Sequence, residues 1–81
     1  MPPPEVARIR RFIADEFFVD PPGDEESLTA TGTIDSLGMM SLVAYVGEAI
    51  GARVPNRDLT PKNFDSIARI ARYIEAHRRP P

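Results

Sequence analysis

Cysteine is absent from this 81-residue sequence, and histidine occurs once, at His77. Without cysteine the chain forms no disulfide and offers no thiolate to a metal. It also has no thiol of its own, so any thiol chemistry must come from an added group. His77 has no cluster of metal-ligand residues around it, and we find neither a nucleophile–base pair nor a glycine-rich phosphate loop. These absences give no basis for predicting an enzyme.

Long apolar runs are missing as well. No stretch approaches the roughly 20 apolar residues that span a bilayer. Residues 1–4 (MPPP) are not followed by the apolar run that a signal peptide needs. We therefore expect a cytoplasmic, monomeric protein without membrane insertion. The length corresponds to one domain over residues 1–81, with an ordered core from about residue 5 to 76 and short flexible tails.

Basic residues are absent between Phe12 and Ala52, a segment that contains eight acidic residues. From Arg53 to Pro81, seven basic residues accompany three acidic ones. The acidic middle argues against nucleic acid as the main partner, because phosphate binding needs a basic face. It would attract basic partner surfaces. The same acids could instead only solvate a long loop, and the sequence leaves both interpretations open.

Helical periodicity appears in three segments, which we expect to be helices: residues 5–17, residues 36–50, and a last one beginning near residues 65–66. Residues 59–64 predict one short helical turn with proline at its first position. Residues 19–34 show no helical stripe of apolar residues, and they contain a Pro-Pro-Gly sequence that interrupts a helix. This segment therefore predicts a long loop. No strand pattern is present. The predicted fold is an all-α bundle of three main helices and one short helix.

The expected second helix is apolar on two sides. One side is assigned to the core: Met39, Leu42, Val43, Val46, Ala49 and Ile50. The other side is also mostly apolar, although a helix in so small a domain should leave one face in water. We assign Met40 on that side to partner contact and Met39 to the core. The second side comprises Leu37, Met40, Ser41, Ala44 and Glu48.

Residues 32–38 (GTIDSLG) place Ser36 in the first turn of this helix, directly after the long loop. Asp35 and Ser36 are both good N-cap residues, so helix capping alone could explain the pair. A second pair, Asp65 and Ser66, precedes the last helix, and we interpret it as a cap only. The Asp35-Ser36 pair by itself does not show whether Ser36 only caps the helix or takes part in chemistry.

The segment around Ser36 resembles the Asp-Ser-Leu signature of acyl carrier proteins and of the aminoacyl and peptidyl carriers, in their stand-alone form. The order of helices and the segment 59–67 (LTPKNFDSI) match as well, so the resemblance covers roughly residues 6–76. It implies that the Ser36 hydroxyl receives 4′-phosphopantetheine from coenzyme A and holds acyl or aminoacyl groups as thioesters. An anionic phosphodiester at a helix N-terminus is also favoured by the free N–H groups there.

The resemblance implies three kinds of partner: a phosphopantetheinyl transferase, an acyl- or aminoacyl-loading ligase, and a downstream acyltransferase, synthase or tailoring enzyme. Carriers of fatty-acid synthesis have an acidic second helix, whereas Glu48 is the only acid here. This difference favours polyketide, nonribosomal-peptide or related specialised biosynthesis. The residues expected in transferase or partner recognition are Asp35, Leu37, Gly38, Met40, Ser41, Ala44 and Glu48.

Two other functions remain as alternatives. An unmodified helical adaptor would bind a partner through the apolar face of the second helix. A basic helical DNA binder, the weaker alternative, would use Arg69, Arg72, Arg78 and Arg79.

Overall fold

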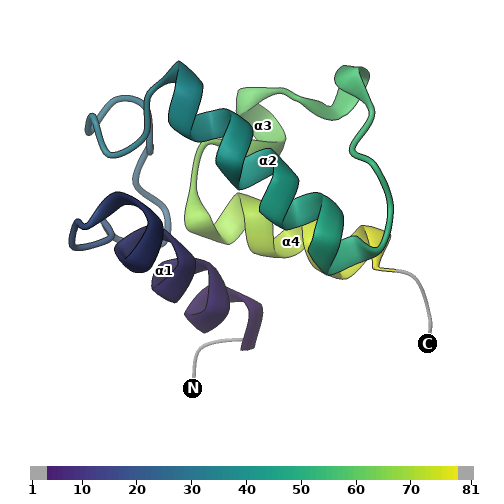
Figure 1. The fold of residues 1–81 in the computed structure, drawn as a ribbon, viewed down its shortest axis with the longest axis horizontal. Coiled ribbons are helices and arrows are strands. Elements are labelled where there is room, and N and C mark those ends of the chain that lie inside the picture. The colour runs from purple at the N-terminus through teal and green to yellow at the C-terminus, as the bar shows by residue number, and fades with distance from the viewer. Residues whose placement is uncertain (1–3, 79–81) are drawn as a thin grey trace.

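The computed structural model describes residues 4–78, and in this part of the chain it contains helices and no strand. Figure 1 shows the all-helical bundle that the periodicity predicts. The second predicted helix has the expected bounds, and the first begins one residue earlier than expected. A short 3-10 helix, η1, was not predicted. The elements are α1 (Pro4–Phe17), α2 (Ser36–Ile50), η1 (Asn56–Asp58), α3 (Pro61–Phe64) and α4 (Ile67–His77).

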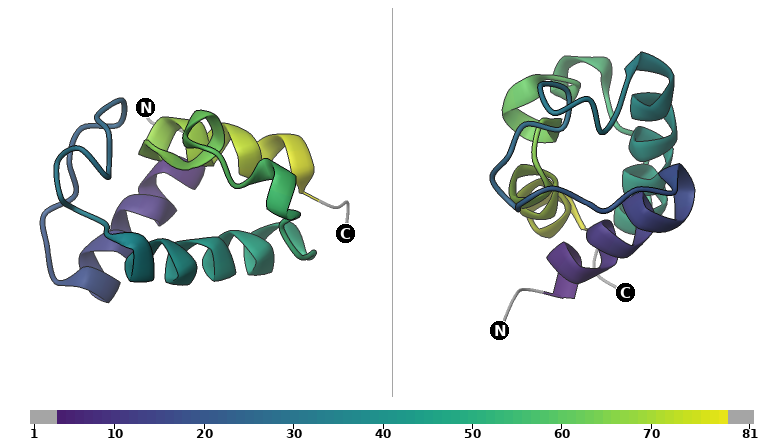
Figure 2. Two further views of the ribbon diagram at one scale, coloured as in Figure 1. Left: turned by 90° about the horizontal axis from the view of Figure 1, so that it is seen from above. Right: turned by 90° about the vertical axis from the view of Figure 1, so that its left-hand side faces the viewer.

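Helix α4 is at the centre of the packing and contacts each of the other three α-helices. In the two views of Figure 2, α2 and α4 run alongside one another while α1 crosses them near the start of α2. Isoleucines at helical spacing on α1 and α4 are fully buried, as the apolar stripes predict. Of the predicted core face of α2, Leu42, Val46 and Ile50 are buried, and the other members pack against the core partly exposed.

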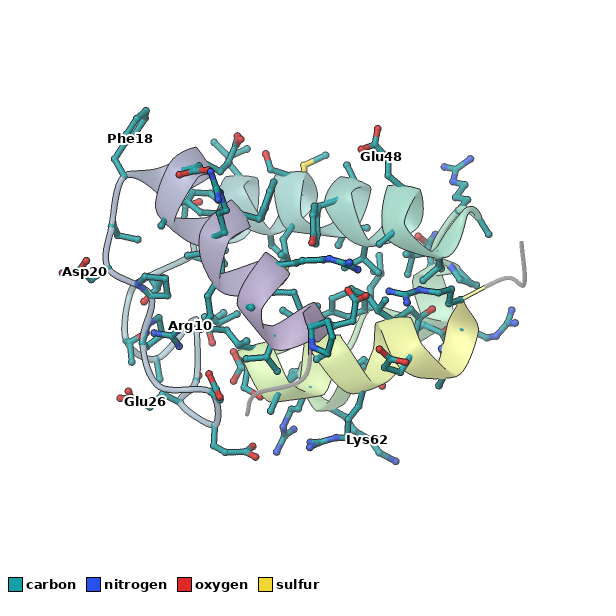
Figure 3. The ribbon with its side chains drawn as sticks, turned by 90° about the horizontal axis from the view of Figure 1, so that it is seen from below. Arg10, Phe18, Asp20, Glu26, Glu48 and Lys62 are labelled. Carbon is teal, nitrogen blue, oxygen red and sulfur yellow. The ribbon has the colours of Figure 1, made fainter. Side chains whose placement is uncertain are left out.

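The long loop between α1 and α2 is held in place by both apolar and polar contacts. Leu28 and Ile34 of this loop are buried in the core. The Arg10 guanidinium donates to the Asp24 carboxylate at 3.0 Å and to the Pro22 carbonyl at 2.7 Å. Figure 3 shows Arg10 pointing into this loop. The loop is therefore fixed to the helices at several points along its length.

The first turn of α1 and the end of α4 are joined by an ion pair. The Glu5 carboxylate is buried and pairs with the Arg8 guanidinium at 3.0 Å and with that of Arg78. From the sequence we expected a flexible tail after about residue 76, which would include His77 and Arg78. Instead, His77 ends α4, where its ring stacks on Tyr73 at 4.0 Å between centroids. The rest of the predicted tail, residues 79–81, lies outside the described residues.

Within residues 4–78, no helix combines the length and the apolar character that crossing a membrane requires.

Candidate functional site

Ser36 is the first residue of α2, and its side chain is exposed. The cap of this helix is Asp35, whose backbone is extended and whose Oδ1 accepts a hydrogen bond from the Gly38 N–H at 2.7 Å. Because Asp35 caps the helix, the Ser36 hydroxyl is not needed for capping. It has no hydrogen-bond partner among the residues that the structure describes. The N-cap interpretation of Ser36 is therefore wrong, and that of Asp35 is confirmed.

In the second Asp-Ser pair, Asp65 and Ser66, the serine caps the helix and the aspartate has another role. Ser66 is buried, and its Oγ accepts a hydrogen bond from the Arg69 N–H at 3.1 Å, so the serine is the cap of α4. Asp65 instead binds the long loop, accepting from the Ser27 hydroxyl at 2.6 Å and the Thr29 hydroxyl at 2.9 Å. These hydrogen bonds, led by that from Ser27, lower the pKa of Asp65. The sequence did not predict this second role.

The start of α2 is packed against the end of α1. A Cβ atom built at Gly38 would lie 2.8 Å from Phe17 Cε1, closer than carbon atoms approach without displacement. Gly38 is thus required by packing in addition to any recognition role. This contact fixes the position of Ser36, two residues earlier, relative to α1.

The predicted partner face of α2 is largely in solvent. Leu37 is 77% exposed and Met40 is 70% exposed, while Ala44 and Glu48 are also exposed. Ser41 is half-buried. Met39, in contrast, packs against the core. The structure thus separates the two methionines in the way that we expected.

An apolar groove of about 900 Å³ runs along α2 from Ser36. Met40, Val43 and Gly47 of α2 contribute to one wall. The segment that leads to α3 contributes Leu59, and α3 itself contributes Phe64. The sequence analysis did not find this groove. The sequence predicted the short turn in its second wall, but no pattern indicated that this turn lies opposite α2.

A partly buried hydrogen bond supports the outer wall of the groove. The Tyr73 hydroxyl donates to the Asp58 carboxylate at 2.7 Å and so ties η1 to α4. Burial of Tyr73, followed by this hydrogen bond, raises its pKa to about 12. Tyr45 stacks on Phe12 with 4.4 Å between ring centroids, and burial raises its pKa as well. Both tyrosines pack between elements.

The exposed Ser36 hydroxyl is accessible from solvent. None of the described residues donates to or accepts from its hydroxyl, so the base that activates a catalytic serine is not in place. In the part of the chain that the structure covers, no group of three or more acidic or histidine side chains could hold a metal ion. The first turn of α2 presents free N–H groups, which favour an anion such as a phosphodiester next to Ser36.

Comparison with known proteins agrees with this geometry. A chain in a solved structure named "Crystal structure of FAD-dependent dehydrogenase" is similar, with 26% identity and a TM-score of 0.67. The match covers 82% of this chain and 97% of that one. No curated protein matched the sequence. The model of the PP-binding family, described as "Phosphopantetheine attachment site", matches residues 7–74. The exposed serine at the start of α2 therefore lies in a chain that belongs to the phosphopantetheine-attachment family, whose members carry 4′-phosphopantetheine covalently.

Proposed function

We propose that this protein carries acyl or aminoacyl groups as thioesters on a 4′-phosphopantetheine arm attached to Ser36. The observation that carries the proposal is the division of roles between Asp35 and Ser36. Asp35 caps α2, which leaves an exposed serine hydroxyl without a structural task at the helix N-terminus. In the attachment step, the Ser36 oxygen would attack the β-phosphate of coenzyme A, lose its proton and release adenosine 3′,5′-bisphosphate.

The test is incubation with a phosphopantetheinyl transferase and coenzyme A, followed by intact-protein mass spectrometry. We expect one phosphopantetheinyl unit on the wild type and none on Ser36→Ala. Ser41→Ala, which removes a hydroxyl from the same helix, should still be modified to completion. A wild type that several competent transferases leave unmodified would contradict the proposal.

The nearly uncharged surface of α2 supports a role in polyketide, nonribosomal-peptide or related specialised biosynthesis. Leu37 and Met40 are the large exposed side chains near Ser36, and Glu48 is the only acid of the helix. The partners would be a loading ligase and a downstream acyltransferase, synthase or tailoring enzyme. Mass spectrometry of the arm isolated from the native host would identify the cargo. A long saturated fatty acyl group as the main cargo would contradict this assignment.

The exposed apolar face of α2 is also the reason to keep the adaptor as a second candidate. The two functions differ in their dependence on Ser36. Cellular activity that survives Ser36→Ala would favour the adaptor, because binding through Leu37 and Met40 does not need the hydroxyl.

The apolar groove beside Ser36 is the place that we assign to an apolar cargo. It begins at the attachment residue and is lined mainly by carbon atoms of α2 and of the segment leading to α3. Apolar grooves of this size hold small ligands.

A further inference from the structure

Phe18, directly after α1, has an exposed ring on an unfavourable backbone. Its side chain is 91% exposed, and its φ is 56°, in the left-handed region. Glycine or asparagine adopts this conformation at lower cost than an aromatic residue. The ring contributes almost no burial to offset that cost. Neither the fold nor its stability therefore accounts for a phenylalanine at this position.

Phe18 lies at the end of the molecule where α2 begins with Ser36. Its neighbour Phe17 contacts Gly38 in the first turn of α2, so the end of α1 and the start of α2 are adjacent. Figure 3 shows Phe18 projecting into solvent at this end, and the left panel of Figure 2 shows the two helix ends side by side. Together with Val19, Leu37 and Met40, Phe18 gives this end of the molecule four large exposed apolar side chains.

The charge around Phe18 is negative. Asp15, Glu16 and Asp20 are exposed and lie within three residues of Phe18 in sequence. Asp15 pairs with Arg11 at 3.7 Å, whereas Glu16 and Asp20 form no ion pair within the described residues. The end of α1 thus combines an apolar anchor with acidic groups.

We propose that Phe18, flanked by Glu16 and Asp20, is a docking site for the phosphopantetheinyl transferase, and that it enters an apolar pocket rimmed by arginine or lysine side chains. A pocket of this kind complements the Phe18 ring by its apolar wall and the carboxylates of Glu16 and Asp20 by its basic rim. This inference rests on the proposed function. The transferase must bring its active site to the Ser36 hydroxyl itself, before any arm extends from the protein. It therefore has to approach the adjacent end of α1 closely, whereas later enzymes reach the cargo through the arm.

The experiment measures kcat/KM for phosphopantetheinylation of the purified protein by a transferase that modifies the wild type. Phe18→Ala should lower kcat/KM about tenfold, the effect of removing an aromatic interface anchor. Phe18→Leu should recover most of the rate, because it restores an apolar side chain. Circular dichroism and thermal unfolding should be unchanged in both variants, since the ring is in solvent.

The charges are tested with the double variant Glu16→Gln/Asp20→Asn. It should lower kcat/KM at low ionic strength, and the difference from wild type should shrink as salt screens the attraction. The double variant Glu25→Gln/Glu75→Gln removes the same charge from other exposed positions and should have the smaller effect.

The outcomes separate this inference from the proposed function. Modification of Phe18→Ala at the wild-type kcat/KM would overturn the docking site and leave carrier function intact. Equal losses in the two charge variants would show that net charge alone matters and would overturn the acidic part of the site. A wild type that no transferase modifies contradicts the proposed function itself, and with it this inference.

Discussion

The carboxylate of Asp35 accepts the Gly38 N–H, and the hydroxyl of Ser66 accepts the Arg69 N–H. Each group satisfies one of the donors that a helix N-terminus leaves unpaired. Like Ser66, Ser36 follows an aspartate in the sequence. Its side chain is nevertheless exposed and forms no hydrogen bond with the described residues. One serine therefore belongs to the folded structure, whereas the other is available for chemistry, and their substitutions should differ accordingly.

We expect Ser66→Ala to lower the free energy of unfolding by about 1–2 kcal/mol, because a buried cap is lost. Asp35→Ala should lower it by about 1 kcal/mol. Ser36→Ala should change it by less than about 0.5 kcal/mol, as is usual for an exposed side chain without partners. Urea unfolding of the three unmodified variants provides the measurement. A loss for Ser36→Ala as large as that for Ser66→Ala would mean that Ser36 has a structural role after all.

The sequence alone could identify Ser36 but could not decide whether it capped α2. Aspartate and serine are nearly equivalent at the N-cap, so adjacent members of the pair compete for one position. The backbone decides the outcome: Asp35 is extended and Ser36 is helical, whereas in the second pair Ser66 is the extended residue. That difference of one residue depends on how each preceding segment packs, which local preferences do not determine.

The loop between α1 and α2 depends on Asp65 at the other end of the chain. Its carboxylate accepts from the hydroxyl groups of Ser27 and Thr29, and its carbonyl accepts from the Leu28 N–H at 2.8 Å. A further backbone bond joins the Ala68 N–H to the Asp24 carbonyl at 2.9 Å. These contacts hold the segment that leads into Asp35 and Ser36. Asp65 and the start of α4 therefore help to position Ser36, the proposed attachment site.

The lowered pKa of Asp65 gives this anchor a defined pH dependence. Folding favours the charged form, so its contribution to stability is fully present above the unfolded pKa of about 4 and is lost as pH falls through the lower folded pKa. Asp65→Asn should cost about 1–2 kcal/mol at pH 7, as expected for a half-buried carboxylate with charge-assisted hydrogen bonds. The difference between the two proteins should shrink below about pH 4. Urea unfolding across pH 2.5–7 measures it.

Asp20→Asn is the matched control, because Asp20 is an exposed acid of the same loop. It should be close to wild type at every pH. A constant difference between Asp65→Asn and wild type down to pH 2.5 would contradict the role of the Asp65 charge. Hydrogen exchange of the Leu28 amide provides a second readout, since loosening of the loop should expose it.

Periodic burial explains which elements were predictable. The helices were found because each buries a stripe of apolar residues, which leaves a 3.6-residue pattern in the sequence. Helix η1, the loop contacts of Asp65 and the bond from Tyr73 to Asp58 were missed. Helix η1 has three residues and is too short to leave a periodic pattern. The other two contacts join polar groups that are distant in sequence and leave no periodic pattern either. The groove was missed because its walls come from α2 and from the segment before α3, and no periodic pattern indicates that these two face one another.

At the scale of the whole molecule, the core and the groove lie on adjacent sides of α2. Leu42, Val46 and Ile50 pack into the core, whereas Val43 and Gly47 line the groove. The bond between Tyr73 and Asp58 keeps the opposite wall in place without filling the space between the walls. The small domain thus retains an apolar surface next to Ser36 while its core is complete.

This arrangement predicts that an apolar cargo on the arm folds back along α2. With an octanoyl group on the arm, amide NMR signals of Gly47 and Leu59 should shift relative to the acetyl form, while those of Ala7 should not. Because a pocket buries most of its ligand, hydroxylamine should cleave the octanoyl thioester about threefold more slowly than the acetyl one. Ala44→Phe places a ring in the groove and should abolish this protection. Ala7→Phe, at an exposed position of α1, should retain it. Equal cleavage rates and no shifts along α2 would mean that the cargo stays in solvent, and the groove would then not be a cargo site.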